Sequence, residues 1–191
     1  MIEFFGLPGS GKSYLADKKS NEEGLKILKI HNRFEKYFFA LLFFVLHPFF
    51  FLFFIKKIVE ETKNNPSLLR HKIFFLYFDV AAKDMKSRIR GRQTINDQGI
   101  FQFILSIYER KINQEDLCVY RKYLKRDQYF IYIVETDHEI RKKRMQDRRR
   151  IPRKVFGEEY VKRWSEISEH NFVIIKDFIL ANFEYKVLTN N

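Results

Sequence analysis

Hydrophobic and polar residues follow two different periods along this chain, and the periods divide it into short strands and longer helices. Short strand candidates occur at residues 2–5, 25–30, 93–96, 129–134 and 185–188, of which 129–134 is fully apolar. Amphipathic stretches that predict helices occur at residues 13–19, 67–90, 100–111, 115–126, 139–150, 158–168 and 172–183. Strands that alternate with helices indicate an α/β protein built around a mostly parallel sheet. Because no internal repeat or Gly/Ser-rich linker interrupts the pattern, residues 1–191 are interpreted as a single domain.

One stretch departs from this alternation because it is apolar on every side. Residues 37–55 contain nine phenylalanines, and only His47 and Pro48 interrupt them. The length suits a membrane span, but a single crossing would place the two halves of the chain on opposite sides of a bilayer. Positive charge at both ends also favours both ends on the same side. The flanking basic residues are Arg33, Lys36, Lys56 and Lys57.

Two interpretations of this apolar helical insert, taken as residues 37–58, remain open. In the first, a helical pair broken near Pro48 lies on a membrane or dips into it. Each arm, about 16 Å long at 1.5 Å per residue, is too short to span the bilayer. In the second, the insert is a buried hairpin that packs on the domain or on a second subunit, which would give a homodimer. A protein of 191 residues has little surface with which to cover a stretch that is apolar on every side, and this favours membrane contact.

The chain carries a formal net charge of +12, and the charge is unevenly distributed. Nine of the fourteen residues from 141 to 154 are lysine or arginine, within a basic segment at residues 137–154. Such charge favours an anionic substrate or an anionic membrane surface. The sequence has no zinc-finger spacing, helix-turn-helix signature or RNA-recognition motif, so nucleic acid is not expected as a partner. The single cysteine excludes an internal disulfide.

The most specific motif lies between the first strand and the first helix. Residues Gly6 to Ser13 read Gly-Leu-Pro-Gly-Ser-Gly-Lys-Ser and fit the P-loop pattern G-x-x-x-x-G-K-[ST]. Glycines allow successive N–H groups to point inward around phosphate oxygens, aided by the positive end of the following helix. Lys12 would reach the β- and γ-phosphates, and the Ser13 hydroxyl would bind Mg²⁺. The predicted nucleotide-binding residues are Gly6, Pro8, Gly9, Ser10, Gly11, Lys12, Ser13 and Tyr14.

Three features follow one another along the chain: the P-loop, the Asp97 turn after a short strand, and the basic helix after residues 129–134. Their order resembles that of the P-loop nucleoside and nucleotide kinases. The organisation is thymidylate-kinase-like. This resemblance implies a three-layer P-loop fold with a five-stranded parallel sheet, and it implies ATP and Mg²⁺ as cofactors. It also implies a lid, whose R-x-x-x-R motif is matched by Arg144 and Arg148. Asp97-Gln98-Gly99 stands where thymidylate kinases have Asp-Arg-Tyr, which weakens the case for a nucleotide acceptor.

The expected activity is therefore that of an ATP-dependent kinase. Lys12, Arg144 and Arg148 would surround the γ-phosphate with positive charge. Asp97 would accept the proton of the acceptor hydroxyl or help Ser13 to hold Mg²⁺, although an aspartate here could also be a simple turn or helix-cap residue. The residues expected to bind an anionic acceptor are Arg33, Arg88 and Arg92.

In such kinases the part of the chain that holds the apolar insert lies near the acceptor. The favoured hypothesis is therefore transfer of the γ-phosphoryl group to a membrane-associated sugar or glycan in surface-polysaccharide metabolism. The protein would be cytoplasmic and peripheral to the inner face of the cytoplasmic membrane. One alternative is a soluble nucleoside or nucleoside-monophosphate kinase whose insert forms a dimer interface. Another is a non-catalytic nucleotide-binding regulator at the membrane.

Overall fold

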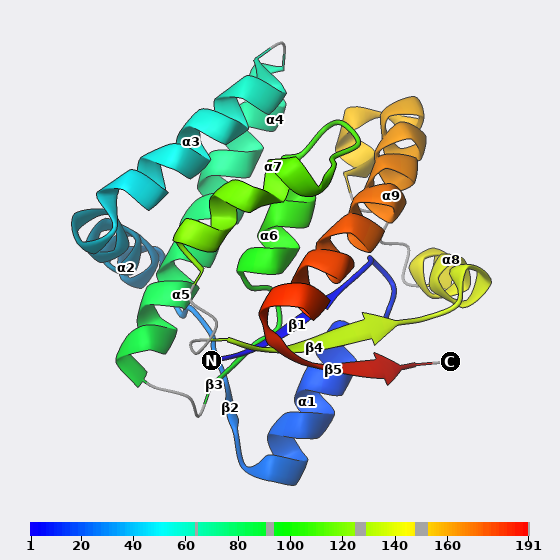
Figure 1. The fold of residues 1–191 in the computed structure, drawn as a ribbon, viewed down its shortest axis with the longest axis horizontal. Helices are drawn as coiled ribbons and strands as arrows, with labels where there is room; N and C mark the ends of the chain where they lie inside the picture. Colours follow the sequence, from blue (N-terminus) through cyan, green and yellow to red (C-terminus); the bar gives the residue numbers. More distant parts are fainter. Residues whose placement is uncertain (64, 91–93, 125–128, 148–152, 191) are drawn as a thin grey trace.

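The computed structural model describes residues 1–63, 65–90, 94–124, 129–147 and 153–190, and Figure 1 shows their arrangement. Within them, five strands form one sheet in the order β2-β3-β1-β4-β5. The strands are β1 (Ile2–Gly6), β2 (Lys26–Ile27), β3 (Thr94–Asn96), β4 (Phe130–Glu135) and β5 (Glu184–Thr189). All neighbouring strands pair in parallel, so the predicted α/β class and parallel five-stranded sheet are confirmed.

Alternate side chains of β1 point to opposite faces of the sheet, so each face builds its own apolar core. On one face Phe4 packs with Ala16 of α1 (Lys12–Glu23). On the other face Phe5 packs against α6 (Ile100–Ile107) and α9 (Glu158–Asn182). Figure 1 shows the resulting three layers, with α1 on one side of the sheet and α6 and α9 on the other. Strand β1, covered on both faces, thus provides a rigid base for the loop that follows it.

Two predicted helical stretches have different bounds in the structure. The stretch predicted as one helix at residues 67–90 consists of α4 (Pro66–Arg70), the π-helical segment η1 (His71–Tyr77) and α5 (Phe78–Arg90). The stretches predicted as helices at 158–168 and 172–183 are helical, but the predicted break between them is wrong, because α9 is one continuous helix. The polar residues between them do not end the helix. Buried Asn171 instead hydrogen-bonds the backbone of the loop that follows α6.

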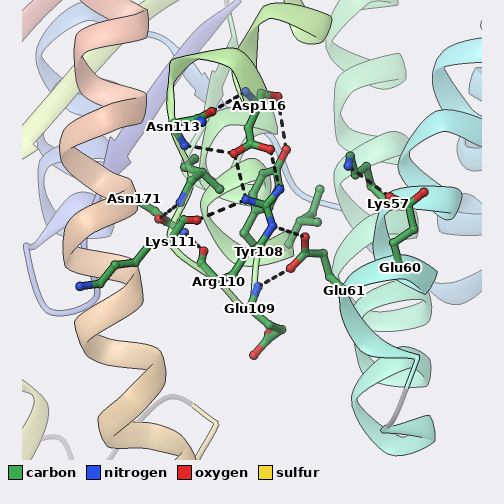
Figure 2. Close-up of polar contacts among 12 residues, drawn as sticks. Lys57, Glu60, Glu61, Tyr108, Glu109, Arg110, Lys111, Asn113, Asp116 and Asn171 are labelled. Atoms are coloured by element: carbon green, nitrogen blue, oxygen red, sulfur yellow. Dashed lines mark hydrogen bonds and ion pairs between the residues drawn. The ribbon is translucent and has the colours of Figure 1, made fainter.

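The helix predicted at residues 100–111 ends early, at Ile107, because the next residues form a polar loop with its own contacts (Figure 2). Asn113 and Asp116 cap the start of α7 (Gln114–Cys118) reciprocally, and Asp116 also pairs with Arg110. The helix predicted at 115–126 is therefore α7 followed by the 3-10 turn η2 (Val119–Lys122). The basic helix predicted at 139–150 is α8 (His138–Asp147), and residues 148–150 lie outside the described part.

The apolar insert forms two helices, α2 (Arg33–Leu46) and α3 (Pro48–Thr62), which bend by 112° at the break between them. The predicted break near Pro48 is confirmed, and proline occupies the first position of α3, where its missing N–H costs nothing. In the described residues no single helix is long and apolar enough to span a membrane, although the bent pair passes that test when both arms are combined. The inner side of the pair is buried in the main core through Phe43, Phe50, Phe54 and Ile58.

Candidate phosphate-binding site

The P-loop connects the end of β1 to the start of α1 and requires glycine at two positions. Gly9 and Gly11 have φ values of +81° and +85°, in the left-handed region that side chains rarely adopt. A Cβ on Gly9 would lie 2.8 Å from the carbonyl oxygen of Arg141, and one on Gly11 would lie 2.0 Å from Asn190 Nδ2. The loop is therefore packed tightly against α8 and against the residue that follows β5.

The Lys12 side chain folds back across this loop. Its Nζ donates hydrogen bonds to the carbonyl oxygens of Gly6, at 2.8 Å, and Leu7, at 2.9 Å. The pKa of Lys12 is lowered to about 7, mainly by burial; the Asp97 carboxylate acts in the opposite direction, and the Arg141 charge makes a smaller contribution in the same direction as burial. A phosphate group in the loop would supply the negative charge that favours the protonated amine. Lys12 is thus poised to exchange two carbonyl oxygens for phosphate oxygens.

Two side chains hold the middle of the P-loop from β4 and from the C-terminal end. The carbonyl oxygen of Ser10 accepts hydrogen bonds from Thr136 Oγ1 at 3.0 Å and from Asn190 Nδ2 at 2.8 Å. The Ser10 hydroxyl itself is buried and has no hydrogen-bond partner within the described residues. Because a buried polar group without a hydrogen bond is costly, this hydroxyl is suited to donate a hydrogen bond to an oxygen of a ligand in the P-loop.

A pocket of about 370 Å³ opens beside the P-loop. It is lined by Gly11, Tyr14, Arg144 and Asn190. Arg144 projects from α8, and its Nη1 donates a hydrogen bond to the backbone oxygen of Asn190 at 3.1 Å. The pocket therefore adjoins the P-loop on one side and the Arg144 guanidinium on the other. This arrangement suits the part of a nucleotide that lies beyond the phosphates held by the P-loop.

Asp97 follows β3, and its position depends on Glu3 in the neighbouring strand β1. The buried Glu3 carboxylate accepts hydrogen bonds from the first N–H groups of α6, at Ile100 (3.0 Å), Phe101 (2.7 Å) and Gln102 (3.2 Å). These bonds fix the turn at residues 97–99 against the base of the P-loop. The Asp97 carboxylate is one-quarter exposed and lies 3.7 Å from Lys83 Nζ.

The structure brings together some of the predicted site residues. Lys12, Ser13 and Arg144 meet at the P-loop, and the charge of Asp97 acts on Lys12. Arg148 and Arg92 lie outside the described residues. The remaining two predicted acceptor-binding residues are Arg33, which is exposed at the start of α2, and Arg88, whose guanidinium bonds Asp84 and Tyr129.

Sequence reasoning missed several residues that shape the site. Glu3 could have been noticed, because a carboxylate inside an otherwise apolar strand needs a buried partner. Thr136 and Asn190 gave no such signal, since their only distinguishing feature is the contact with Ser10 far away in sequence. Lys83 belongs to α5 and reaches Asp97 only through the tertiary fold.

The residues around the loop also fit a magnesium ion. Ser13 is exposed in the first turn of α1, and Asp97 presents a partly exposed carboxylate whose charge acts on the neighbouring Lys12. Hydroxyl and carboxylate oxygens, completed by phosphate oxygens and water, are the ligands that Mg²⁺ prefers.

A parallel sheet between two layers of helices, with a phosphate-binding loop after its central strand, is the fold of P-loop kinases. No protein-family model and no curated protein matches the chain. A structure of deoxyadenosine kinase from M. mycoides, with the products dCMP and a flexible dCDP bound, is similar. It has a TM-score of 0.56 and 16% sequence identity, over 98% of this chain and 88% of that one.

Two further structures of deoxyadenosine kinase from M. mycoides, with dCTP and with dATP bound, have TM-scores of 0.49 and 0.47. Their sequence identities are 16% and 14%, over 98% of this chain and 89% and 90% of theirs. The likeness to the first structure extends over nearly the whole chain and confirms the kinase fold that the order of the P-loop, the Asp97 turn and the basic helix implied.

Proposed function

We propose that this protein is an ATP-dependent phosphotransferase. The observation that carries the proposal is the P-loop geometry: Gly9 and Gly11 are left-handed directly before the start of α1, and the Lys12 amine folds back onto the backbone of the same loop. That arrangement is built for the β- and γ-phosphates of a nucleoside triphosphate. The pocket lined by Tyr14 and Arg144 then receives the remainder of the nucleotide.

The proposed transfer uses positioning and charge rather than covalent chemistry by the protein. Lys12 and the P-loop N–H groups hold the phosphates, and Ser13 would hold Mg²⁺, which would neutralise charge on them. Arg144, together with Arg148, supplies positive charge from the lid side. The oxygen of the acceptor hydroxyl forms a bond to the γ-phosphorus, the bond to the β-phosphate oxygen breaks, and ADP leaves. Asp97 takes the proton of the hydroxyl; in the alternative role it would help Ser13 to hold Mg²⁺.

The acceptor proposed first is a nucleoside or nucleoside monophosphate. Its support is the fold likeness to a protein described as deoxyadenosine kinase, which spans nearly the whole chain. Lys83, beside Asp97, is a charged group on the acceptor side that could contact a polar or anionic acceptor. Arg33, Arg88 and Arg92 remain candidates for the same role.

The second candidate acceptor is a membrane-associated sugar or glycan of surface-polysaccharide metabolism, which would place a cytoplasmic enzyme at the inner face of the membrane. A specific observation favours it: Phe34 of α2 and Phe49 of α3 are 81% and 80% exposed. The third candidate, a nucleotide-binding regulator without transfer activity, has the same P-loop but would need no base at Asp97.

The test is ADP release by the purified protein against an acceptor panel, with Lys12→Ala as the blank. The panel holds deoxynucleosides, nucleoside monophosphates, free sugars and lipid-linked sugar extracts. Turnover with nucleosides supports the first acceptor, and turnover confined to the sugar or lipid fractions supports the second. Asp97→Asn should retain ATP binding and lose transfer by roughly 10²-fold or more. ATP binding without turnover on any acceptor would overturn the proposal in favour of a regulator.

A further inference from the structure

The outer side of α2 and α3 carries most of the large apolar side chains that this protein exposes. Ten of the seventeen such side chains in the described residues belong to these two helices. Together these ten side chains expose on the order of 1,000 Å². This α2–α3 face consists of Phe34, Tyr37, Phe38, Leu41, Phe44, Val45, Leu46, Phe49, Leu52 and Val59.

Polar contacts anchor the face at both of its ends. At the start of α2, Glu35 forms an ion pair with Lys86 of α5, whose side chain is almost fully buried. At the end of α3, the Glu61 carboxylate accepts a hydrogen bond from the backbone N–H of Glu109 at 2.9 Å and pairs with Arg110 at 3.3 Å (Figure 2). Because both ends are fixed to the domain, the exposure of the apolar side chains is a property of the folded structure.

The charges around the face are mainly positive. Arg33 is exposed at the start of α2, and the Lys56 side chain is 77% exposed on α3. The acidic residues of the same two helices are each offset by a basic partner: Glu35 by Lys86, Glu61 by Arg110, and Glu60 by one of the two charges of Lys57 and Lys56, which lie 3.1 Å and 3.9 Å from it. Apolar aromatic side chains bordered by cations match the surface of a bilayer that contains anionic lipids.

We propose that the α2–α3 face docks this protein on an anionic lipid bilayer, with the two helices lying in the interface rather than crossing it. An apolar groove of about 440 Å³ between the helices, lined by Tyr37, Phe44, Phe51 and their apolar neighbours, offers room for hydrocarbon. A second copy of the chain fits less well, because association would bring two molecules of charge +12 together with their basic rims facing. Docking is independent of which acceptor the P-loop site serves.

The test is flotation of the full-length protein with phosphatidylcholine vesicles, with and without phosphatidylglycerol. The informative variant is Phe34→Ser with Phe49→Ser, because both side chains are highly exposed and lie in the first turn of a helix, where serine is tolerated. The matched control is Val155→Ser with Val173→Ser, which removes exposed apolar side chains elsewhere. Circular dichroism and a thermal unfolding curve check that each variant is folded.

The wild-type protein and the control should float with the anionic vesicles, and the Phe34/Phe49 variant should bind them about tenfold more weakly or worse. Added salt should weaken binding by every version. Absence of flotation with anionic vesicles, or an equal loss in the control, would overturn the proposal. A wild-type dimer that dissociates in the Phe34/Phe49 variant and never floats would identify a second copy as the occupant. Turnover of soluble acceptors by the same variant reports separately on the phosphotransferase.

Discussion

Glu3 and Gly99 approach each other so closely that no side chain could stand at position 99. A Cβ on Gly99 would lie 2.2 Å from Cδ of the Glu3 carboxylate. The approach exists because that carboxylate must reach the first N–H groups of α6, which have no partner within their own helix. A strand and a helix nearly a hundred residues apart are thereby joined directly behind Asp97.

Replacement of Gly99 by alanine should therefore destabilise the protein by about 2–4 kcal/mol, since the methyl group must displace a buried carboxylate and its hydrogen bonds. Urea unfolding measures the loss. Gly24→Ala is the matched control, because Gly24 has a positive φ of +66° but open space around its Cα. The control should lose only about 1 kcal/mol of backbone strain. If the two variants lose the same stability, the contact between Glu3 and position 99 is not the cause.

The pH dependence of stability should carry a contribution from Glu3. Burial raises the pKa of Glu3 from 4.5 to about 8, although its hydrogen bonds to backbone N–H groups act in the opposite direction. Between these values the folded state keeps a proton that the unfolded chain has released, so this contribution to stability falls as the pH rises. The slope is at most about 1.4 kcal/mol per pH unit.

Glu3→Gln, which cannot ionise, should remove this slope. Unfolding free energies measured in urea between pH 5 and 8 should fall more steeply for the wild type than for the variant. The difference in slope should be at most about 1.4 kcal/mol per pH unit, the value for one proton. Only the difference in slope enters, so a constant loss of stability in the variant does not affect the result. Parallel curves over this interval would show that Glu3 is already ionised in the folded protein.

The contrast between the P-loop and Glu3 shows what the sequence could predict. The P-loop is local: its glycines, Lys12 and Ser13 act within eight consecutive residues, so the motif identifies its own geometry. The parallel sheet also follows from local patterns, because each strand is a short apolar run. The role of Glu3 depends on α6, and the contact of Asn190 with Ser10 joins the two ends of the chain. No periodicity in the sequence encodes such pairs.

The errors in the predicted helices have similar physical causes. Two helices were predicted, at residues 158–168 and 172–183, but α9 runs through both, and the side chain of Asn171 between them bonds the loop after α6. The apolar insert was correctly predicted to break near Pro48, whereas its division into a buried side and an exposed side depends on packing against α5 and the main core. Composition alone contains no information on which side of such a helix the core will cover.

A buried ionic cluster provides a prediction that is independent of the nucleotide site. Glu109 pairs with Lys72 at 2.5 Å and with Arg153 at 2.8 Å, and it accepts a hydrogen bond from the Tyr160 hydroxyl at 2.9 Å. The Lys72 and Arg153 side chains are 0% and 6% exposed. Glu109→Gln would leave both cations buried without a counter-charge and should cost about 3–5 kcal/mol in urea unfolding.

The matched control for this cluster is Glu60→Gln. Glu60 also has two basic partners, Lys56 and Lys57, but its side chain is 45% exposed to solvent. Water and salt screen such a pair, so the control should lose at most about 1 kcal/mol. A loss in Glu109→Gln no larger than in Glu60→Gln would mean that the buried cations find other partners.

Asn190 should influence nucleotide affinity although it lies outside the P-loop motif. Its amide holds the Ser10 carbonyl oxygen, a task shared with Thr136. Asn190→Ala alone should weaken ADP binding about fivefold, the value of one hydrogen bond of roughly 1 kcal/mol, because Thr136 still satisfies Ser10. The double variant Asn190→Ala with Thr136→Val leaves the Ser10 carbonyl oxygen without a donor from either side chain. Its fold-loss in ADP affinity should therefore exceed the product of the fold-losses of the two single variants.

Calorimetric titration with ADP measures these affinities. Asn182→Ala is the control, because Asn182 is an asparagine at the end of α9 whose side chain contacts Phe178 and Arg121 rather than the P-loop. It should bind ADP as the wild type does. Equal affinities for all of these proteins would mean that the P-loop keeps its shape without support from the C-terminal end. If the fold-loss of the double variant equals the product of the two single losses, Thr136 and Asn190 act on the loop independently.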